Sequence, residues 1–384
     1  MRKGSRLRIV IAIILSVCLG LSFTACLSKK NTTKKSKNNS TSSASPSGID
    51  DSKYHGSLDE LGPLSAKSVL SDPEKNIYDN LCTIIEKFET TYDFSENLSV
   101  DSLKKIVSAI QDDKPEFFWL ETYIWSTTDE KLTSIEFSYN CSSITQKQSK
   151  QANIDSYISE FLSGINSNMN AYEKVKYTHD YLIKNTDYLI DAQDSQNICS
   201  VFINGKTVCA GYAKSTQYLL KKLGIRCAYV SGEAIGRGSH AWNMIELDGD
   251  YYYLDVTWDD PAFGGGQLQD YIGYNYFCIT TDELKRTHSL SENLIDFPVC
   301  TATKDNYFVK ENLIFNGING SELQRLKDKI NESVAAGNKF FASKFTSPQL
   351  ARDAVDEITR MENFIGKSVK YTIDEKYSTL VLFL

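Results

Sequence analysis

The feature that most constrains the fold of this chain is the dipeptide Asp248-Gly249, which separates two runs rich in aromatic and β-branched residues. Asp-Gly is a strong signal for a two-residue hairpin turn, because both central positions of that turn need a positive φ. We therefore expect antiparallel strands over residues 239–247 and 250–257, with Leu247 paired with Asp250.

The expected register places a histidine and an aspartate on one face of the hairpin. His240 would pair with Thr257, and Asp255 would pair with Trp242, which makes His240 and Asp255 diagonal neighbours about 7 Å apart at Cα. A three-residue loop would put them on opposite faces, since side chains alternate along a strand. An imidazole and a carboxylate can bridge this gap, so we expect them to form a pair.

A helix with a cysteine in its first turn is expected before the hairpin. Thr207 is a suitable N-cap, and Gly224 is a natural left-handed stop at the other end. Cys209 then lies at the positive end of the helix dipole, where a thiolate is favoured over a thiol. Gly211 leaves the backbone beside the cysteine open to a close approach by a substrate.

These three side chains have the chemistry of acyl transfer. Cys209 would attack a carbonyl carbon and form a thioester, and His240 would activate the thiol and protonate the leaving amine. Asp255 would accept the other ring N–H, which fixes the tautomer and stabilises the imidazolium. We therefore predict that Cys209, His240 and Asp255 are catalytic.

Further residues complete the predicted site. The backbone N–H of Cys209 is the first candidate for an oxyanion donor, and Gln196, upstream of it, is a candidate for the second. Trp242 and Trp258 pack beside the hairpin and are possible walls of the site. No cofactor or metal site is expected.

The motifs of this stretch resemble the bacterial transglutaminase-like superfamily. Cys-Ala-Gly-Tyr-Ala, Ser-His-Ala-Trp-Asn and Asp-Val-Thr-Trp-Asp-Asp follow one another in order, after a lead-in helix over residues 172–185. The resemblance covers residues 171–277. It implies a papain-like α+β core, in which the nucleophile helix packs on an antiparallel sheet. It also implies that Cys209, His240 and Asp255 are the nucleophile, base and orienting acid.

The other cysteines and histidines have structural interpretations. No Cys-x-x-Cys pair occurs after residue 26, so a structural zinc site is not expected. Cys199 is a weaker rival nucleophile because no helix start directly follows it, and Cys227 is expected in the core. We expect His179 to be a packed or surface residue in the middle of a helix, whereas His288 could line the cleft.

The amino terminus is typical of a bacterial lipoprotein. A basic segment and an apolar segment precede Leu-Ser-Phe-Thr-Ala-Cys, so residues 1–26 are interpreted as a signal peptide with Cys26 lipidated. The alternative is an uncleaved anchor over residues 9–27. Both place the protein on the extracytoplasmic face of the membrane. Residues 27–60 are polar and read as a disordered tether.

Charge limits the possible partners. Residues 1–50 hold nine Lys and Arg and one Asp, a net charge of +8, whereas the remainder holds 33 Lys and Arg and 48 Asp and Glu, a net charge of −15. An acidic folded part argues against nucleic-acid binding. The expected partners are the membrane, through the lipid anchor, and a protein or peptide substrate, including a cell-wall-associated one.

The catalytic domain is expected over residues 171–300, and its residues 271–277 are predicted to form another strand. Two further regions flank this domain. Residues 61–170 form an α/β accessory region with helices over 74–88, 100–111 and 154–165 and strands over 117–126 and 132–139. Residues 301–384 form a small α+β domain with helices over 321–335 and 348–361 and strands over 307–309, 339–345, 367–373 and 379–384.

Three functions are compatible with these residues. The first is a surface-anchored cysteine peptidase or amidase, in which water resolves the thioester. The second is a transglutaminase, in which a lysine amine resolves it. The third is a binding module that keeps the fold without catalysis. We favour the first, because water is always available and no dedicated amine site is visible in the sequence.

Overall fold

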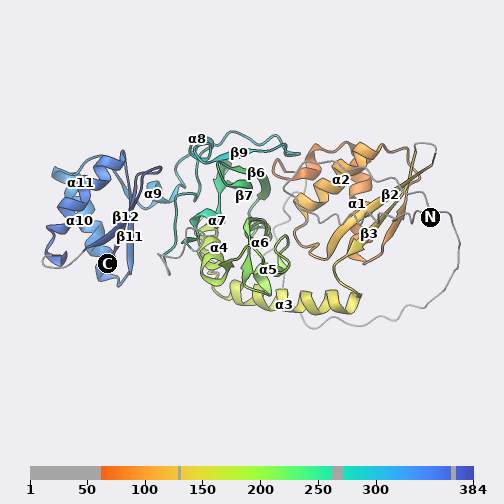
Figure 1. Ribbon diagram of the computed structural model, residues 1–384, viewed down its shortest axis with the longest axis horizontal. Helices are drawn as coiled ribbons and strands as arrows, with labels where there is room; N and C mark the ends of the chain where they lie inside the picture. The colour runs from red at the N-terminus through yellow and green to blue at the C-terminus, as the bar shows by residue number, and fades with distance from the viewer. Residues whose placement is uncertain (1–61, 129–130, 262–270, 365–368) are drawn as a thin grey trace, which may run out of the picture.

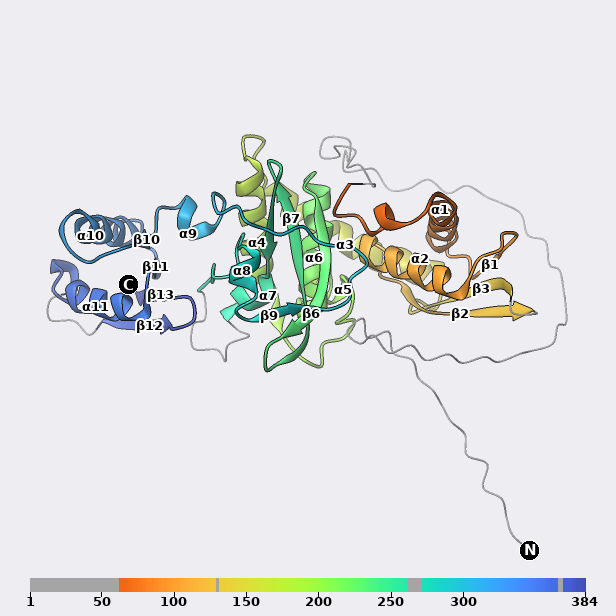
Figure 2. The same ribbon diagram turned by 90° about the horizontal axis from the view of Figure 1, so that it is seen from above.

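The computed structural model describes residues 62–128, 131–261, 271–364 and 369–384. Within them, three regions follow one another along the longest axis of the molecule, with the central region between the other two (Figures 1 and 2). Each region combines helices with its own sheet of three or four strands, and a two-stranded pair lies in the central region. The chain therefore has the α+β class that the sequence indicates.

The amino-terminal region packs two helices against a three-stranded antiparallel sheet. α1 (Asp72–Glu86) begins where the Glu74 carboxylate accepts the Ser71 N–H at 2.8 Å, and α2 (Val100–Asp113) begins where Ser99 caps the first turn. Both helices are predicted from the helical periodicity of the sequence and are confirmed. The predicted strand pair is also confirmed, and the sheet runs in the order β1 (Thr91–Asp93), β3 (Lys131–Tyr139), β2 (Leu120–Thr128).

α3 (Ile144–Ser163) leads from the amino-terminal region to the central region (Figures 1 and 2). It begins ten residues before the expected start at residue 154, because Ser143 caps it by accepting from the backbone N–H of Gln146. Its first half is largely exposed and polar, so no apolar stripe marks it in the sequence. α4 (Ala171–Asn185) follows and confirms the predicted lead-in helix.

The central region packs one helix on a four-stranded antiparallel sheet. α6 (Cys209–Lys222) contacts the sheet, whose order is β8 (Asp250–Leu254), β7 (Gly238–Leu247), β6 (Cys227–Ala234), β9 (His288–Leu290). The hairpin turn is confirmed, since Asp248 and Gly249 have φ of 50° and 82° and Leu247 pairs with Asp250. Shorter elements complete the region: β4 (Asp187–Tyr188), α5 (Cys199–Phe202), β5 (Lys206–Thr207), α7 (Val256–Asp259) and α8 (Thr281–Leu284).

Three expectations about strands are wrong. β8 ends at Leu254, because Asp255 caps the short helix α7 instead of continuing the strand. Residues 271–277 form no strand; the only bridge in that vicinity joins Tyr253 to Ile279. Residues 307–309 lie in the helix α9 (Tyr307–Lys310), which begins where Asn306 accepts from the backbone of Phe308.

The carboxy-terminal region places helices against a second four-stranded sheet. The helices predicted over 321–335 and 348–361 are confirmed as α10 (Gly320–Ala335) and α11 (Pro348–Thr359), with a short turn η4 (Glu362–Phe364) after them. The sheet has the order β10 (Ile314–Phe315), β11 (Phe340–Phe345), β13 (Thr379–Phe383), β12 (Lys370–Asp374), and only β10 and β11 run parallel within it.

Both outer regions make polar contacts with the central one. The Gln217 side chain donates to the Asp112 carbonyl at 2.7 Å, and Lys221 donates to the Asp113 carbonyl, which ties α6 to the end of α2. On the other side, Lys344 forms an ion pair with Glu283 at 2.8 Å. The outer regions are therefore docked on the central region and not merely linked to it.

The predicted leader, the lipidation residue Cys26 and the tether lie outside the described residues. Within the described part of the chain, no helix combines the length and apolar character that crossing a bilayer requires.

Candidate active site

Cys209 is the first residue of α6, so it lies at the positive end of the helix dipole as expected. Val208, not Thr207, is the N-cap, because Thr207 belongs to β5 and its hydroxyl contacts the Ser200 hydroxyl at 2.7 Å. Cys209 packs beside Tyr229 and Ala241. The position of Cys209 is therefore set by the junction of β5 with α6 and by the sheet beneath it.

Accessibility separates Cys209 from the other cysteines. All seven described cysteines have free thiols, and six of them are buried, whereas Cys209 is partly exposed. A short helix does begin at Cys199, contrary to expectation, but burial raises the pKa of its thiol to about 12. Burial likewise raises the pKa of Cys227. Of the described thiols, Cys209 is the one that a substrate can reach.

His240 and Asp255 are in direct contact, although not through the predicted register. His240 lies on β7 and pairs with Gly232 of β6, while Asp255 lies beyond the end of β8. The pairs His240–Thr257 and Trp242–Asp255 therefore do not form. As the N-cap of α7, Asp255 accepts from the Trp258 N–H through Oδ1, and its Oδ2 lies 2.7 Å from His240 Nε2.

The pKa values of this pair favour its charged form. Burial alone would lower the pKa of His240, but the Asp255 carboxylate and the Cys209 thiol outweigh it and raise the pKa to about 10. Burial would raise the pKa of Asp255, but the adjacent imidazole rings of His240 and His288 hold it well below its usual range. An imidazolium is thus stabilised next to the sulfur, which is the condition for a thiolate nucleophile.

The contacts also assign the two ring nitrogens of His240. Nε2 is taken by Asp255 at 2.7 Å, which leaves Nδ1 for the Cys209 thiol, whose interaction with the ring helps to raise the pKa of His240. This order of sulfur, imidazole and carboxylate matches the roles predicted for the three residues.

The first predicted oxyanion donor, the backbone N–H of Cys209, is available to a ligand. As the first residue of α6, Cys209 has a backbone N–H without an intrahelical acceptor, and no other acceptor for it exists among the described residues. Gln196 lies half-buried in the turn before α5, and no hydrogen bond joins it to Cys209 or His240 in the described part of the chain. Its role stays a prediction.

Gly211 has a different role from the one expected. A Cβ at this position would lie 1.9 Å from the Thr207 hydroxyl oxygen and 2.5 Å from that of Ser200. The missing side chain therefore lets α6 approach β5 and α5, which is a packing requirement, and it does not open the backbone to substrate.

Trp242 and Trp258, which the sequence indicates as packing residues or walls of the site, both lie beside His240. The ring of Trp242 is stacked on His240 with centroids 5.8 Å apart, and that of Trp258 lies at 5.9 Å. Trp242 is buried, whereas Trp258 is half-buried. They form an apolar wall that lowers the local dielectric constant around the His240–Asp255 pair.

A second histidine reaches the same carboxylate. His288 is fully buried and does not line a cleft; its Nε2 lies 3.2 Å from Asp255 Oδ2. His240, Asp255 and His288 together supply atoms that could bind a metal. Ligand atoms of a tetrahedral zinc site lie about 3.3 Å apart, however, so the 2.7 Å contact between His240 and Asp255 fits a direct ion pair.

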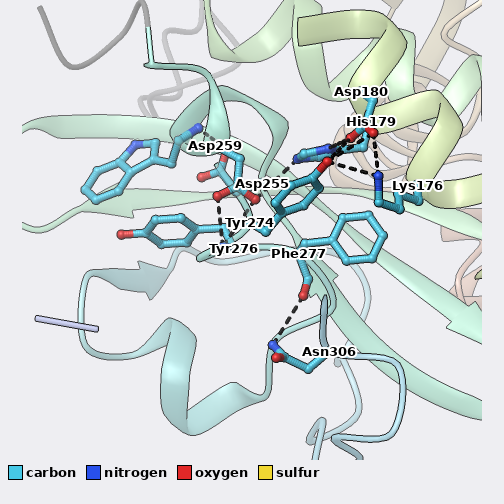
Figure 3. A network of polar contacts seen from close by, with 10 residues as sticks. Lys176, His179, Asp180, Asp255, Asp259, Tyr274, Tyr276, Phe277 and Asn306 are labelled. Atoms are coloured by element: carbon cyan, nitrogen blue, oxygen red, sulfur yellow. Dashed lines mark hydrogen bonds and ion pairs between the residues drawn. The ribbon is translucent and has the colours of Figure 1, made fainter. Parts of the chain in front are cut away.

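A second polar network holds α7 in place (Figure 3). His179 of α4 is buried between two carboxylates, with Nδ1 2.9 Å from Asp180 Oδ1 and Nε2 3.3 Å from Asp259 Oδ2. Asp259 also accepts the Tyr276 N–H at 3.0 Å, and Lys176 pairs with Asp180 at 2.7 Å. Because Asp259 ends the helix that Asp255 begins, this network helps to fix the orientation of the Asp255 carboxylate.

Sequence reasoning therefore missed two features of the site. Asp255 followed by Trp258 and Asp259 carries an N-cap signal that could have indicated a helix start. For His288, no local signal exists, since only the pairing of β9 with β6 brings it to Asp255.

A comparison with family models identifies a superfamily for the central part of the chain. A model of the transglutaminase-like superfamily matches residues 159–256, which include all three predicted catalytic residues. No curated protein matches the sequence.

Solved structures with partial similarity include a TGase, with 14% identity, a TM-score of 0.27 and coverage of 44% of this chain and 50% of the other. A candidate cysteine protease from Cytophaga hutchinsonii has 15% identity and a TM-score of 0.25, over 35% of this chain and 61% of the other. The periplasmic domain of TgpA from Pseudomonas aeruginosa, bound to ethylmercury, has 14% identity and a TM-score of 0.21, over 36% and 67%. This chain thus spans about half of the first of these structures.

Proposed function

Since residues 159–256 carry a transglutaminase-like core, we propose that this protein catalyses thiol-dependent acyl transfer on amide bonds of proteins or peptides. The observation that carries the proposal is the contact series from Cys209 through His240 to Asp255. It joins the one partly exposed thiol of the described residues to a buried, charged imidazole–carboxylate pair.

The reaction follows from the position of each group. The Cys209 thiolate attacks the amide carbonyl carbon, and the backbone N–H of Cys209 donates to the developing oxyanion. His240, as the imidazolium, gives its proton to the leaving amine when the carbon–nitrogen bond breaks and the thioester forms. His240 then takes a proton from the incoming nucleophile, and the free thiolate is restored. Asp255 keeps the imidazolium oriented throughout.

The incoming nucleophile decides between two activities. Water gives an acid and makes the protein a cysteine peptidase or amidase, whereas a lysine amine gives an isopeptide bond and makes it a transglutaminase. We favour water, because it needs no binding site of its own.

The proposed place of action is the outer face of a bacterial membrane. The lipoprotein-type residues 1–26, with Cys26 as the lipidated residue, support this location, and the polar tether would let the catalytic region reach a substrate away from the membrane.

The test uses the full chain with two substrates, fluorescent casein and casein with a fluorescent alkylamine. We expect the full chain to release casein peptides, and Cys209→Ala should lose this activity completely. Cys199→Ala, the matched control that removes a buried thiol, should keep it. Amine incorporation would instead identify the transglutaminase. If Cys209→Ala retains every activity, the fold serves as a binding module and the proposal is wrong.

A further inference from the structure

The polar contacts of the site do not end at Asp255. They continue through His288, whose Nδ1 lies 2.8 Å from the Thr287 hydroxyl, to Tyr377, whose hydroxyl lies 3.2 Å from that of Thr287. We call His288, Thr287 and Tyr377 the triad extension. All three are buried, and Tyr377 belongs to the carboxy-terminal region, in the turn between β12 and β13.

The sheet brings the triad extension to Asp255 by a close approach of two strands. β9 pairs antiparallel with β6, with Ala234 opposite His288 and Gly232 opposite Leu290. A Cβ on Gly232 would lie 2.1 Å from the Ser289 carbonyl oxygen, so the strands meet this closely only because residue 232 is glycine. The position of His288 is therefore built into the sheet.

The aromatic surroundings keep water away from His288. The ring centroids of Trp258 and Trp242 lie 4.7 Å and 4.9 Å from that of His288, and Tyr276 meets it edge-on at 5.6 Å. In this setting an interaction between a ring N–H and a carboxylate is stronger than in water, and an unfavourable tautomer is correspondingly costly.

The partners of His288 place a proton on the nitrogen that faces Asp255. Its Nε2 faces the ionised Asp255 carboxylate at 3.2 Å, so Nε2 must carry a proton to avoid repulsion between lone pairs. Nδ1 lies 2.8 Å from the Thr287 hydroxyl, which also lies 3.3 Å from the Leu284 carbonyl and can donate to either acceptor. The Thr287 oxygen, in turn, can accept from Tyr377.

The contact with Asp255 is weaker than that of His240, which suits a supporting role. It is 0.5 Å longer, and the His288 N–H is not aligned for a straight hydrogen bond, so its Nε2 has no hydrogen-bond partner within the described part of the chain despite the short distance. His288 thus holds Oδ2 from a second direction and leaves the linear bond to His240.

We propose that His288 is a positioning residue for Asp255, and that Thr287 and Tyr377 set its orientation, so that docking of the carboxy-terminal region tunes the catalytic pair. This inference rests on the proposed function, because it assigns the triad extension to the same reaction. It gives the carboxy-terminal region a defined role in the site in addition to support.

The reactivity of Cys209 tests the inference without a known substrate. Iodoacetamide would be added to the full-length protein at pH 7, and alkylation of the tryptic peptide of residues 207–214 would be followed by mass spectrometry, with the thermal midpoint of each variant measured in parallel. We expect His288→Phe to slow alkylation about tenfold, while His288→Gln, which keeps an N–H donor, stays within about threefold of the wild type.

Thr287→Val and Tyr377→Phe remove only hydroxyl groups and serve if His288→Phe fails to fold. Both should slow alkylation, the first by about fivefold and the second by about threefold, and Thr287→Val should add little in a His288→Phe background, because it acts through the same ring. The inference is wrong if folded His288→Phe is alkylated at a rate within twofold of the wild type, or if Thr287→Val and Tyr377→Phe both are. It is also wrong if the effects of Thr287→Val and His288→Phe on the alkylation rate are fully additive.

His240→Ala separates the two proposals. It should slow alkylation more than any variant of the triad extension. If His240→Ala has no effect, the proposed function fails and the inference fails with it. If His240→Ala slows the reaction but His288→Phe does not, only the inference is wrong.

Discussion

At the scale of single residues, the site depends on a carboxylate that is kept ionised in an apolar setting. Asp255 is almost completely buried, and its stabilisation comes from His240, His288 and the Trp258 N–H. A buried charge is tolerated only when such partners surround it. Small chemical changes here should therefore have large effects on the reaction.

Asp255→Asn keeps the size of the side chain but removes the charge that stabilises the imidazolium. We expect the turnover of casein to fall by at least about 100-fold, since the loss of the orienting carboxylate in a triad has effects of this order or larger. Asp180→Asn, which alters a carboxylate of the network around His179, is the matched control and should lose far less activity. Equal losses in the two variants would contradict the role of Asp255.

The raised pKa of His240 predicts how stability depends on pH. Because folding raises this pKa to about 10, protonation of His240 favours the folded state. Its contribution is complete below the ordinary histidine pKa of about 6.5, declines as the pH rises, and is gone above about pH 10. The difference in thermal midpoint between the wild type and His240→Gln should shrink over that interval. A difference that grows with pH would contradict the assignment.

The sequence predicts the chemistry of the three residues better than their local structure. Cys209 at a helix start is readable from the glycine stop and the basic last turn. The contact of Asp255 with His240 is predicted correctly, but from an incorrect strand register. Residues 255–257 are expected to continue the strand, whereas Asp255 caps a helix. His288 cannot be predicted, since its position depends on a strand pairing 54 residues away along the chain.

At the scale of elements, two glycines of the central sheet meet different requirements. Gly249 has a φ of 82° and open space around its missing Cβ, so the turn needs its conformational freedom. Gly232 lacks a side chain because β9 and Trp242 lie too close to admit one. The two positions offer a direct comparison between backbone strain and steric contact.

Gly249→Ala should lower the free energy of unfolding by about 1–2 kcal/mol, the cost of a left-handed conformation, and should leave the alkylation rate of Cys209 unchanged. Gly232→Ala should lower both, because β9 must move and His288 moves with it. Urea unfolding and iodoacetamide labelling measure the two quantities. Unchanged labelling in Gly232→Ala would show that β9 does not control the site.

Local patterns account for most, but not all, of the elements. The amphipathic helices α1, α2, α10 and α11 follow from periodicity, and the β7–β8 hairpin follows from its turn residues. Residues 271–277 and 307–309 mislead because aromatic residues favour strands on average. In this fold Tyr274 instead stacks on Tyr307 with centroids 3.7 Å apart, so tertiary packing determines the conformation.

At the scale of the whole molecule, the docking of the carboxy-terminal region depends on a half-buried ion pair. Lys344 of β11 lies 2.8 Å from Glu283 of α8. Burial alone would raise the pKa of Glu283, but the Lys344 charge and the cap of α8 lower it, so the carboxylate is charged at neutral pH. The Tyr377 contacts lie at the same interface.

Lys344→Met removes the ammonium and leaves that carboxylate without its counter-ion. We expect a loss of about 1–2 kcal/mol in the free energy of unfolding, between the values of exposed and fully buried pairs. In a Glu283→Gln background, Lys344→Met should lower the free energy of unfolding by less. A double-mutant cycle by urea denaturation will measure the difference. Strict additivity would mean that the pair contributes nothing to docking.

The distribution of thiols gives the chain a set of internal reporters of its own unfolding order. Cys82 and Cys141 are buried in the amino-terminal region and Cys199, Cys227 and Cys278 in the central one. Pulsed alkylation at increasing urea concentration will therefore show separately at which concentration each core opens. Simultaneous appearance of both groups would identify one cooperative unit, and staggered appearance would identify two.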